Sequence, residues 1–235
     1  MVKFINYAHR GAPAYYPENT MLSFKAGVEM GANGIETDVQ VSKDGVLVLF
    51  HDDTLDRVTG ASGAIKDYTY NELSKIRVKH NGLEDKIPTF EEFLNYFKDF
   101  DLTFAIELKV GGVETAVADM IFKVGVQDKV IITSFNFDYI SNIKKYAPSL
   151  RVGYLTYGMD NSVNENLKNI GGYEICPNAK QISNKDVDKW HELGFNVRAW
   201  NIENEAVMIN AVNIGVDGMT VNFPDKLTSY MKLKG

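Results

Sequence analysis

The stretch "GIETDVQVSKDGVLVLFHDDT", residues 34–54, contains two apolar runs joined by a very short linker. The runs 34–41 and 46–51 are rich in β-branched residues and bounded by turn residues, which is typical of β-strands. A parallel crossover needs about a dozen residues or more, so the linker "SKDG" can only join antiparallel strands. We therefore expect a β-hairpin early in the chain.

Two registers of this hairpin are open, and both bring the same side chains together. If "KD" forms a two-residue loop, Glu36 lies opposite His51; if "DG" forms it, the partner of His51 is Asp38. Because side chains alternate between the faces of a strand, both registers place Glu36, Asp38 and His51 on one face. The nearest pair is then about 4.5–5.5 Å apart at Cβ, so a site is expected here.

Outside the hairpin, strand-like runs alternate with segments of helical periodicity. Further strands are expected at 4–9, 102–108, 129–135, 151–156, 173–178, 196–202 and 218–222, and helices at 19–31, 89–100, 113–125, 137–148, 183–194 and 204–215. This alternation predicts a parallel sheet flanked by helices. About eight strands in 235 residues favour a (β/α)8 TIM barrel over an open doubly wound sheet. Approximately residues 52–90 are expected to form a small insertion near the barrel mouth.

Composition limits the classes of function. With 45% hydrophobic residues the chain can bury a sizeable core, and one domain over residues 1–235 is expected. A net charge of −6 without a basic run argues against a nucleic-acid partner. Neither a signal peptide nor an apolar stretch of about 18 residues is evident, so we expect a cytoplasmic protein without a membrane span. The single cysteine excludes an internal disulfide, and nothing indicates the oligomeric state.

Three carboxylates are predicted to converge at strand ends. Glu36 and Asp38 stand two apart on one strand, and Glu107 lies at the end of another. Acidic groups brought together without compensation repel one another, and one hard divalent cation, Mg²⁺ or Ca²⁺ or else Mn²⁺, would relieve that repulsion through oxygen ligands. Zinc is less suitable because no HExxH or CxxC pattern occurs. The alternative for each acid alone is a solvated strand end.

Histidines and cations complete the candidate site. His9 and His51 suit proton transfer, one as acid and one as base, although each alone could be a hydrogen-bonded strand-end residue. Arg10 offers a fork of donors suited to a phosphate, and Glu18 is a candidate partner that orients it. Lys109 lies beside the carboxylates and would stabilise charge on a phosphoryl group.

Aromatic residues lie near two other strand ends. Phe135 and Trp200 can form an apolar wall of the pocket, or they can belong to the core. His80 and His191 stand in loop or helix contexts and are given no role.

These residues belong to an ordered series of motifs: "HRG" at 9–11, "PENT" at 17–20, "ETDV" at 36–39, "KDG" at 43–45, "HD" at 51–52 and "ELK" at 107–109. The series resembles that of the glycerophosphodiester phosphodiesterase family, and the similarity continues to "DGMTVNFPD" near the C-terminus. The resemblance implies a (β/α)8 barrel with an early hairpin. It also implies metal-dependent hydrolysis of a small glycerophosphodiester to an alcohol and sn-glycerol 3-phosphate.

The resemblance assigns roles to particular residues. It implies that His9 and His51 are the acid/base pair and that Glu36, Asp38 and Glu107 are the metal carboxylates. It further implies that Arg10 and Lys109 bind the phosphate and that Trp200 lines the substrate. Two positions depart from the family pattern. Val58 stands where a threonine is usual, and Asn222 stands where an aspartate is usual.

Other functions remain open from the sequence. Related barrels with the same layout act as lysophospholipase D-like or sphingomyelinase D-like enzymes, and a non-catalytic barrel could bind phosphate esters. The sequence does not decide which histidine is the acid. Nor does it decide whether water attacks directly or a neighbouring substrate hydroxyl first forms a cyclic phosphate.

Overall fold

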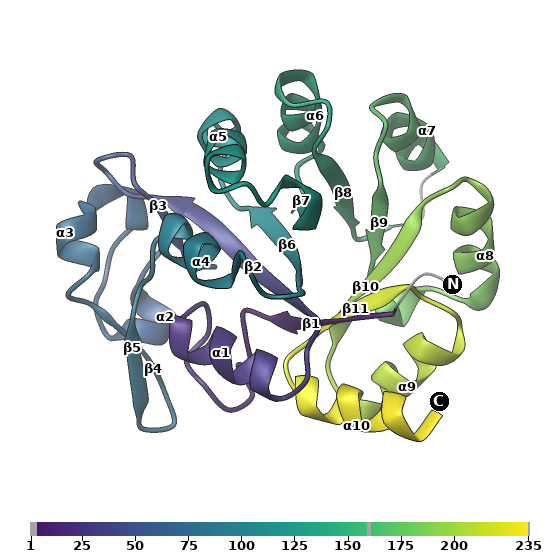
Figure 1. The fold of residues 1–235 in the computed structure, drawn as a ribbon, viewed down its shortest axis with the longest axis horizontal. Helices are drawn as coiled ribbons and strands as arrows, with labels where there is room; N and C mark the ends of the chain where they lie inside the picture. The colour runs from purple at the N-terminus through teal and green to yellow at the C-terminus, as the bar shows by residue number, and fades with distance from the viewer. Residues whose placement is uncertain (1–3, 159–160, 235) are drawn as a thin grey trace.

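Within residues 4–158 and 161–234, which the computed structural model describes, eight parallel strands close into a barrel (Figure 1). They pair in the order β1-β11-β10-β9-β8-β7-β6-β2, and a parallel pairing of β1 with β2 closes the ring. The strands are β1 (Ile5–His9), β2 (Gly34–Val41), β6 (Thr103–Leu108), β7 (Val130–Ser134), β8 (Arg151–Thr156), β9 (Glu174–Pro177), β10 (Asn196–Ile202) and β11 (Gly218–Val221). The predicted (β/α)8 barrel is confirmed, and the open-sheet alternative is wrong.

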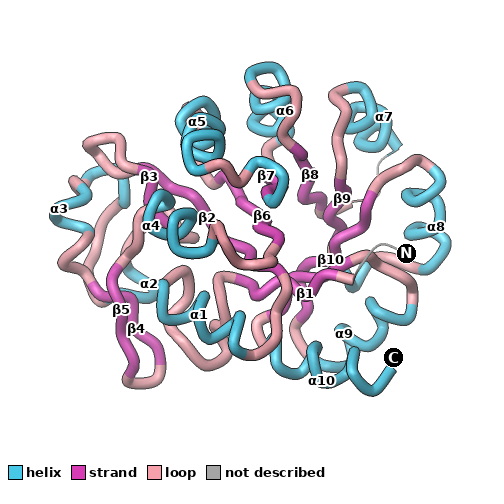
Figure 2. The backbone as a smooth tube through the Cα atoms, in the orientation of Figure 1, coloured by secondary structure: helices cyan, strands magenta, loops and turns pink. Residues whose placement is uncertain are grey.

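Helices surround the ring of strands (Figure 2). The longer ones are α1 (Met21–Glu29), α4 (Phe90–Phe97), α5 (Glu114–Val124), α6 (Phe137–Tyr146), α7 (Asn161–Asn169), α8 (Asn184–Glu192), α9 (Glu205–Asn213) and α10 (Pro224–Lys234), with 3₁₀ turns at Gln127–Lys129 and Ala179–Gln181. The six predicted helices are confirmed. The sequence did not predict α7 and α10, because polar residues dominate both segments.

Helix α4 shows how the outer layer packs on the barrel. Its N-cap Thr89 accepts a hydrogen bond from the Glu92 amide at 3.0 Å, which starts the helix. Its phenylalanines face inward, and the ring of Phe93 lies 4.9 Å from that of Phe24 on α1 and 5.4 Å from that of Phe104 on β6. Burying such a side chain contributes about 1.5–3 kcal/mol, so the aromatic face holds the helix on the barrel.

The early hairpin has a three-residue loop. β2 pairs antiparallel with β3 (Leu47–Leu49). The Ser42 amide donates to the Val46 carbonyl at 3.0 Å and closes a loop of residues 43–45. Gly45 ends the loop at a φ of +83°, in the left-handed region that favours glycine. The antiparallel hairpin is therefore confirmed, but both predicted registers are wrong by one residue.

This register also overturns the argument that placed His51 by strand alternation. Continued past the end of β3, the pairing would place His51 opposite Thr37, whose side chain points to the other face from Glu36 and Asp38. Because β3 ends at Leu49, the alternation does not extend to His51. The Phe50 amide still donates to the Asp38 carbonyl at 3.0 Å, and after it a bend carries the His51 imidazole to the cavity described below.

Residues 50–89 form a lobe beside the barrel, which we call the insertion lobe (Figure 1). It contains α2 (Asp56–Thr59), a 3₁₀ turn (Ile65–Asp67), α3 (Tyr70–Leu73), β4 (Arg77–His80) and β5 (Leu83–Lys86). Buried apolar side chains from the lobe and from β3, including Phe50 and Leu73, form a small hydrophobic core separate from that of the barrel.

The strands β4 and β5 were not predicted. They form an antiparallel pair joined by Asn81 and Gly82, which both have positive φ angles, 48° and 79°. An Asn-Gly pair is a strong signal for such a two-residue turn, so the sequence contained the evidence for this hairpin.

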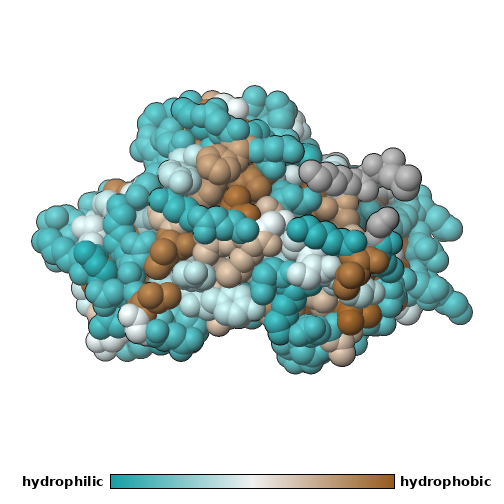
Figure 3. All heavy atoms as spheres, turned by 60° about the horizontal axis from the view of Figure 1, so that its bottom comes forward, coloured by the Kyte–Doolittle hydropathy of each residue, from teal (hydrophilic) through white to brown (hydrophobic). Residues whose placement is uncertain are grey.

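The exterior is mainly polar on the face seen in Figure 3, where hydrophobic patches are separated by hydrophilic residues. Among the described residues, no helix is both long and apolar enough to cross a membrane.

Candidate active site

A cavity of about 380 Å³ opens at the carboxyl ends of the barrel strands. Parallel barrels carry their functional residues at this end, because the loops after the strands meet there. Seven of the eight predicted site residues line the cavity: His9, Arg10, Glu36, His51, Glu107, Lys109 and Trp200. Asp38 is only 1% exposed and lies among them as a buried neighbour.

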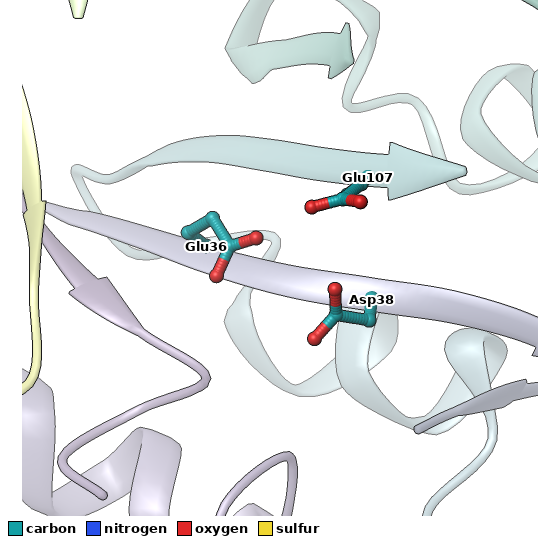
Figure 4. Close-up of side chains that lie close together, drawn as sticks. All are labelled: Glu36, Asp38 and Glu107. Carbon is teal, nitrogen blue, oxygen red and sulfur yellow. The ribbon is translucent and has the colours of Figure 1, made fainter. Parts of the chain in front are cut away.

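The three predicted carboxylates converge between two neighbouring strands (Figure 4). Glu36 and Asp38 project from β2, and Glu107 stands level with Asp38 on β6. Each offers a carboxylate oxygen, and these atoms all lie within 4.8 Å of one another. Burial, followed by the charges of Asp38 and Glu107, raises the pKa of Glu36 well above its ordinary value. Burial and Asp38 also raise the pKa of Glu107.

Asp38 is held as an anion by surrounding donors. Its Oδ2 lies 3.3 Å from Arg10 Nε and accepts a hydrogen bond from Asn19 Nδ2 at 2.8 Å, while Lys109 Nζ lies 3.8 Å from Oδ1. Burial alone would raise the pKa of Asp38, but Arg10 and the other positive and hydrogen-bonding neighbours outweigh it and lower the pKa. The sequence suggests Asn19 or Thr20 as the cap of α1, and the structure shows that Thr20 is the cap. Asn19 is therefore a site residue that was missed, although it lies within the "PENT" motif.

The carboxylate cluster fits a hard divalent cation. All of its donors are oxygen atoms, and oxygens on one Ca²⁺ at about 2.3–2.6 Å can lie up to about 5 Å apart, which matches the observed spacing. Arg10 and Lys109 offset two of the three negative charges, so one negative charge remains for a cation to compensate. Mg²⁺, with ligands at about 2.0–2.1 Å, would need the three groups to draw closer together.

His9, at the end of β1, is oriented by a residue from the far end of the chain. Its Nδ1 lies 2.5 Å from Oδ1 of Asn222. Because the amide oxygen only accepts, Nδ1 carries the proton and Nε2 presents a lone pair, 3.9 Å from Oε2 of Glu36. Burial and the nearby Arg10 guanidinium lower the pKa of His9 to about 3. This ring is therefore a neutral proton acceptor across the neutral pH range.

His51 has a carboxylate partner in place of an amide. Its Nδ1 donates to Oδ1 of Asp52 at 2.6 Å, which leaves Nε2 as the free ring nitrogen at the cavity. The two histidines thus line one cavity with chemically different supports. Sequence reasoning identified both rings but neither of these partner roles.

Arg10 and Lys109 bring positive charge to the cavity wall. Arg10 adopts a positive φ of 51°, and its Nη1 donates to Oε1 of Glu18 at 2.9 Å, so the predicted partner is confirmed. Lys109 Nζ donates to Oε1 of Glu107 at 2.8 Å. Both side chains reach the cavity, where an anionic group would meet them.

Aromatic residues form another part of the wall. The ring of Trp200 lies 5.1 Å from that of Phe135 and 5.2 Å from that of Tyr157, and the last two stack at 4.6 Å. Phe135 and Trp200 thus both line the cavity, as one of the two predicted alternatives required. Tyr157 was not predicted, although it directly follows β8 and is 66% exposed. His80 and His191 lie outside the cavity lining.

A buried ion pair lies deeper in the barrel. Arg198 is 1% exposed, and its Nε donates to Oε2 of Glu174 at 2.9 Å while Nη1 donates to Oγ1 of Thr220 at 2.9 Å. Its guanidinium also contributes to the cavity lining. The pair neutralises charge inside the barrel, below the carboxylate cluster.

Comparisons with known proteins agree with this geometry. A sequence model of the glycerophosphoryl diester phosphodiesterase family matches residues 9–226. The chain is 33% identical to a glycerophosphodiester phosphodiesterase of Caldanaerobacter subterraneus subsp. tengcongensis, covering 100% of both chains. It is also 33% identical to a glycerophosphodiester phosphodiesterase of Bacillus altitudinis, covering 94% of this chain and 95% of the relative.

A solved structure adds a ligand to the comparison. The chain superposes with a TM-score of 0.87 and 26% identity on a phosphodiesterase of Oleispira antarctica in complex with the product sn-glycerol-3-phosphate. The match covers 97% of this chain and 96% of that one.

Proposed function

The chain belongs to the glycerophosphoryl diester phosphodiesterase family, and on this premise we propose that it hydrolyses glycerophosphodiesters to an alcohol and sn-glycerol 3-phosphate. One observation carries the proposal: two differently supported histidines line the same cavity as a buried cluster of three carboxylates. A barrel that only bound phosphate esters would have no use for two poised imidazoles.

Glu36, Asp38 and Glu107 are the residues that would hold one divalent cation, Mg²⁺ or Ca²⁺ or else Mn²⁺. When bound there, such a cation supplies Lewis-acid stabilisation of the negative charge on the phosphoryl group. Arg10 and Lys109 bind the remaining phosphate charge, because both cationic side chains line the cavity beside the cluster.

His9 acts as the general base. Its Nε2 carries the lone pair, and the low pKa keeps it unprotonated at neutral pH. It takes the proton from the attacking hydroxyl, which belongs either to water or to the substrate itself.

His51 acts as the general acid. To act as an acid, the ring of His51 must carry a proton on Nε2 as well as on Nδ1, and it is then positively charged. The carboxylate of Asp52 stabilises this charged ring through its hydrogen bond with Nδ1. When the phosphorus–oxygen bond of the leaving alcohol breaks, Nε2 of His51 protonates the departing oxygen. The amide of Asn222 cannot give His9 the same compensation, which distinguishes the two roles.

The test is a coupled assay for glycerol 3-phosphate released from glycerophosphocholine and glycerophosphoethanolamine, after chelation and after adding back Mg²⁺, Ca²⁺ or Mn²⁺. Turnover should require a metal, and His9→Ala or His51→Ala should each lose roughly 100-fold or more. His191→Ala is the matched control, because His191 lies outside the cavity and bonds Asp217 instead.

Other outcomes would identify the rival functions. Turnover of lysophospholipids with poor activity on glycerophosphocholine would establish the lysophospholipase D-like alternative. Binding of glycerophosphodiesters without product, in the presence of metal, would establish a non-catalytic barrel and refute hydrolysis.

A further inference from the structure

One arginine of the insertion lobe forms two forked interactions with two carboxylates. Arg57 lies on α2, outside the cavity lining, and its side chain is 47% exposed. Toward Asp52, Nε donates to Oδ2 at 2.6 Å and Nη2 donates to Oδ1 at 3.0 Å. Toward Glu18, Nη1 donates to Oε2 at 2.8 Å and Nη2 donates to Oε1 at 2.7 Å. A single guanidinium plane therefore fixes both carboxylates.

Each of these carboxylates also holds a residue of the cavity. Oδ1 of Asp52 accepts the Nδ1 proton of His51, and Oε1 of Glu18 accepts from Nη1 of Arg10. The hydrogen bonds thus form a continuous network from His51 through Asp52, Arg57 and Glu18 to Arg10. This network has two arms, one from Arg57 to His51 and one from Arg57 to Arg10.

The two carboxylates of this network are held in their charged form. Burial would raise the pKa of Asp52, but hydrogen bonds from Arg57 and His51 outweigh it and lower the pKa to about 2. Burial acts on Glu18 in the same way, and Arg57 and Arg10 again lower the pKa. Both carboxylates therefore remain anionic acceptors throughout the neutral range.

The forks constrain geometry more than an isolated exposed ion pair does. Glu18 and Asp52 are only 13% and 24% exposed, and both pair with one guanidinium through two hydrogen bonds each. The planar fork of arginine fixes carboxylate geometry in a way that lysine cannot match. These four hydrogen bonds therefore orient the two carboxylates that hold the cavity residues.

We propose that Arg57 is a positioning residue that orients the acid His51 through Asp52 and the phosphate-binding Arg10 through Glu18. This inference rests on the proposed function for the roles of His51 and Arg10. It makes α2 of the insertion lobe part of the catalytic apparatus, although no atom of Arg57 reaches the cavity.

Two variants, each of which breaks one arm of the network, separate its effects on kcat and KM. Asp52→Asn should lower kcat with little change in KM, because it affects the acid. Glu18→Gln should chiefly raise KM, because it affects the phosphate site. Arg57→Ala should do both, with kcat about 10- to 100-fold lower, as expected for a displaced reacting group. Arg57→Lys should recover only part of the loss, because one ammonium cannot form both forks.

The matched control is Arg77→Ala, which removes another exposed arginine of the same lobe, one whose guanidinium donates to the backbone carbonyls of Ser74 and Ile76. Its kcat and KM should equal those of wild type. Added guanidinium ion, at concentrations below denaturation, should raise the activity of Arg57→Ala and leave that of Arg77→Ala unchanged.

A spectroscopic readout makes the test independent of turnover. In proton and ¹⁵N NMR spectra, Arg57→Ala should shift or broaden the ring resonances of His51, assigned through His51→Ala, and leave unchanged those of His191, which lies outside the cavity and bonds Asp217. Unchanged His51 resonances together with wild-type kcat and KM in Arg57→Ala would refute the proposal. If wild type hydrolyses no glycerophosphodiester but the His51 resonances still respond, the proposed function fails while the positioning role stands.

Discussion

The two histidines that we propose as catalytic differ in the residue that accepts a hydrogen bond from Nδ1 of each ring. Asn222 accepts from Nδ1 of His9, and Asp52 accepts from Nδ1 of His51. Both supports expose Nε2 to the cavity, but only the carboxylate compensates a positive ring. In the proposed mechanism, the difference between the neutral amide of Asn222 and the carboxylate of Asp52 thus separates the base from the acid.

This difference makes Asn222→Asp an informative substitution. A carboxylate beside Nδ1 favours the protonated ring, so it should raise the pKa of His9 from about 3. Below the raised pKa the base is protonated and inactive, so the acidic limb of the kcat/KM profile should move to higher pH.

The control for that substitution is Asn222→Ala, which removes the orienting bond without adding charge. It should lower kcat without moving the acidic limb upward. A pH profile of Asn222→Asp that coincides with that of wild type would contradict the role given to His9.

At the scale of elements, the hairpin loop decides the register of the strand that leads toward His51. Gly45 holds a φ of +83° at the end of the loop, and a Cβ added there would meet nothing within 4 Å. The cost of replacing it is therefore confined to the backbone. A three-residue loop with a left-handed last residue is a common hairpin connection, which explains why both two-residue readings were wrong.

Gly45→Ala should destabilise the protein by about 1–2 kcal/mol, the cost of placing a non-glycine residue in the left-handed region. Gly45→Asn should cost less, because asparagine adopts this conformation more readily. Urea unfolding of the three proteins measures the order. Equal stability of the alanine variant and wild type would mean that the loop has another conformation.

Helix α4 permits a second test at this scale. Phe93 is fully buried between α1 and β6, so Phe93→Ala should cost about 3–5 kcal/mol through lost burial and a cavity. Asn95→Ala on the exposed side of the same helix should change the free energy of unfolding by about 0.5 kcal/mol or less. Similar losses for both variants would contradict the inward packing of α4.

At the scale of the whole molecule, closure of the barrel assembles the site from distant parts of the chain. β1 pairs with both β2 and β11, which brings His9 beside Glu36 and Asn222. The same closure buries three carboxylates, and Arg10 and Lys109 pair directly with two of them, Asp38 and Glu107. The apoprotein therefore holds unfavourable charge that a bound cation would relieve.

Adding a divalent cation to chelated protein should raise the stability by about 2.7 kcal/mol at 100 times Kd. For a chain of this size each kcal/mol corresponds to a Tm change of about 2–4 °C. Without metal, the contribution of Glu36 to stability is fully present below its ordinary pKa of 4.5 and is lost as the pH rises through the raised pKa, because burial disfavours the charged form.

Glu36→Gln tests the same charge balance, because it should change the stability in opposite directions without and with metal. It should stabilise the chelated protein at neutral pH, because a buried repelled charge is removed, and it should reduce the gain on adding metal. Thermal unfolding with and without Mg²⁺ or Ca²⁺ gives both numbers. A wild-type gain that persists in full in Glu36→Gln would place the cation elsewhere.

Much of the fold and of the candidate site was predictable because it depends on local patterns. Each barrel strand is a short apolar run, and helical periodicity marked most of the helices. Glu36 and Asp38 share a face because they stand two apart on a strand, whatever lies around them. Hard oxygen donors and two histidines near strand ends then indicated a metal-assisted reaction.

The sequence by itself therefore determined the alternation of strands and helices, the antiparallel sense of the hairpin and the oxygen chemistry of the cluster. Only the tertiary structure decided the hairpin register, the path that brings His51 to the cavity, and the partners Asn222 and Arg57. The physical reason is that these features depend on contacts between residues far apart in the sequence or on the exact length of a loop. A one-residue change in a loop reverses every side chain that follows it in a strand, and contacts such as that between His9 and Asn222 exist only once the barrel has closed.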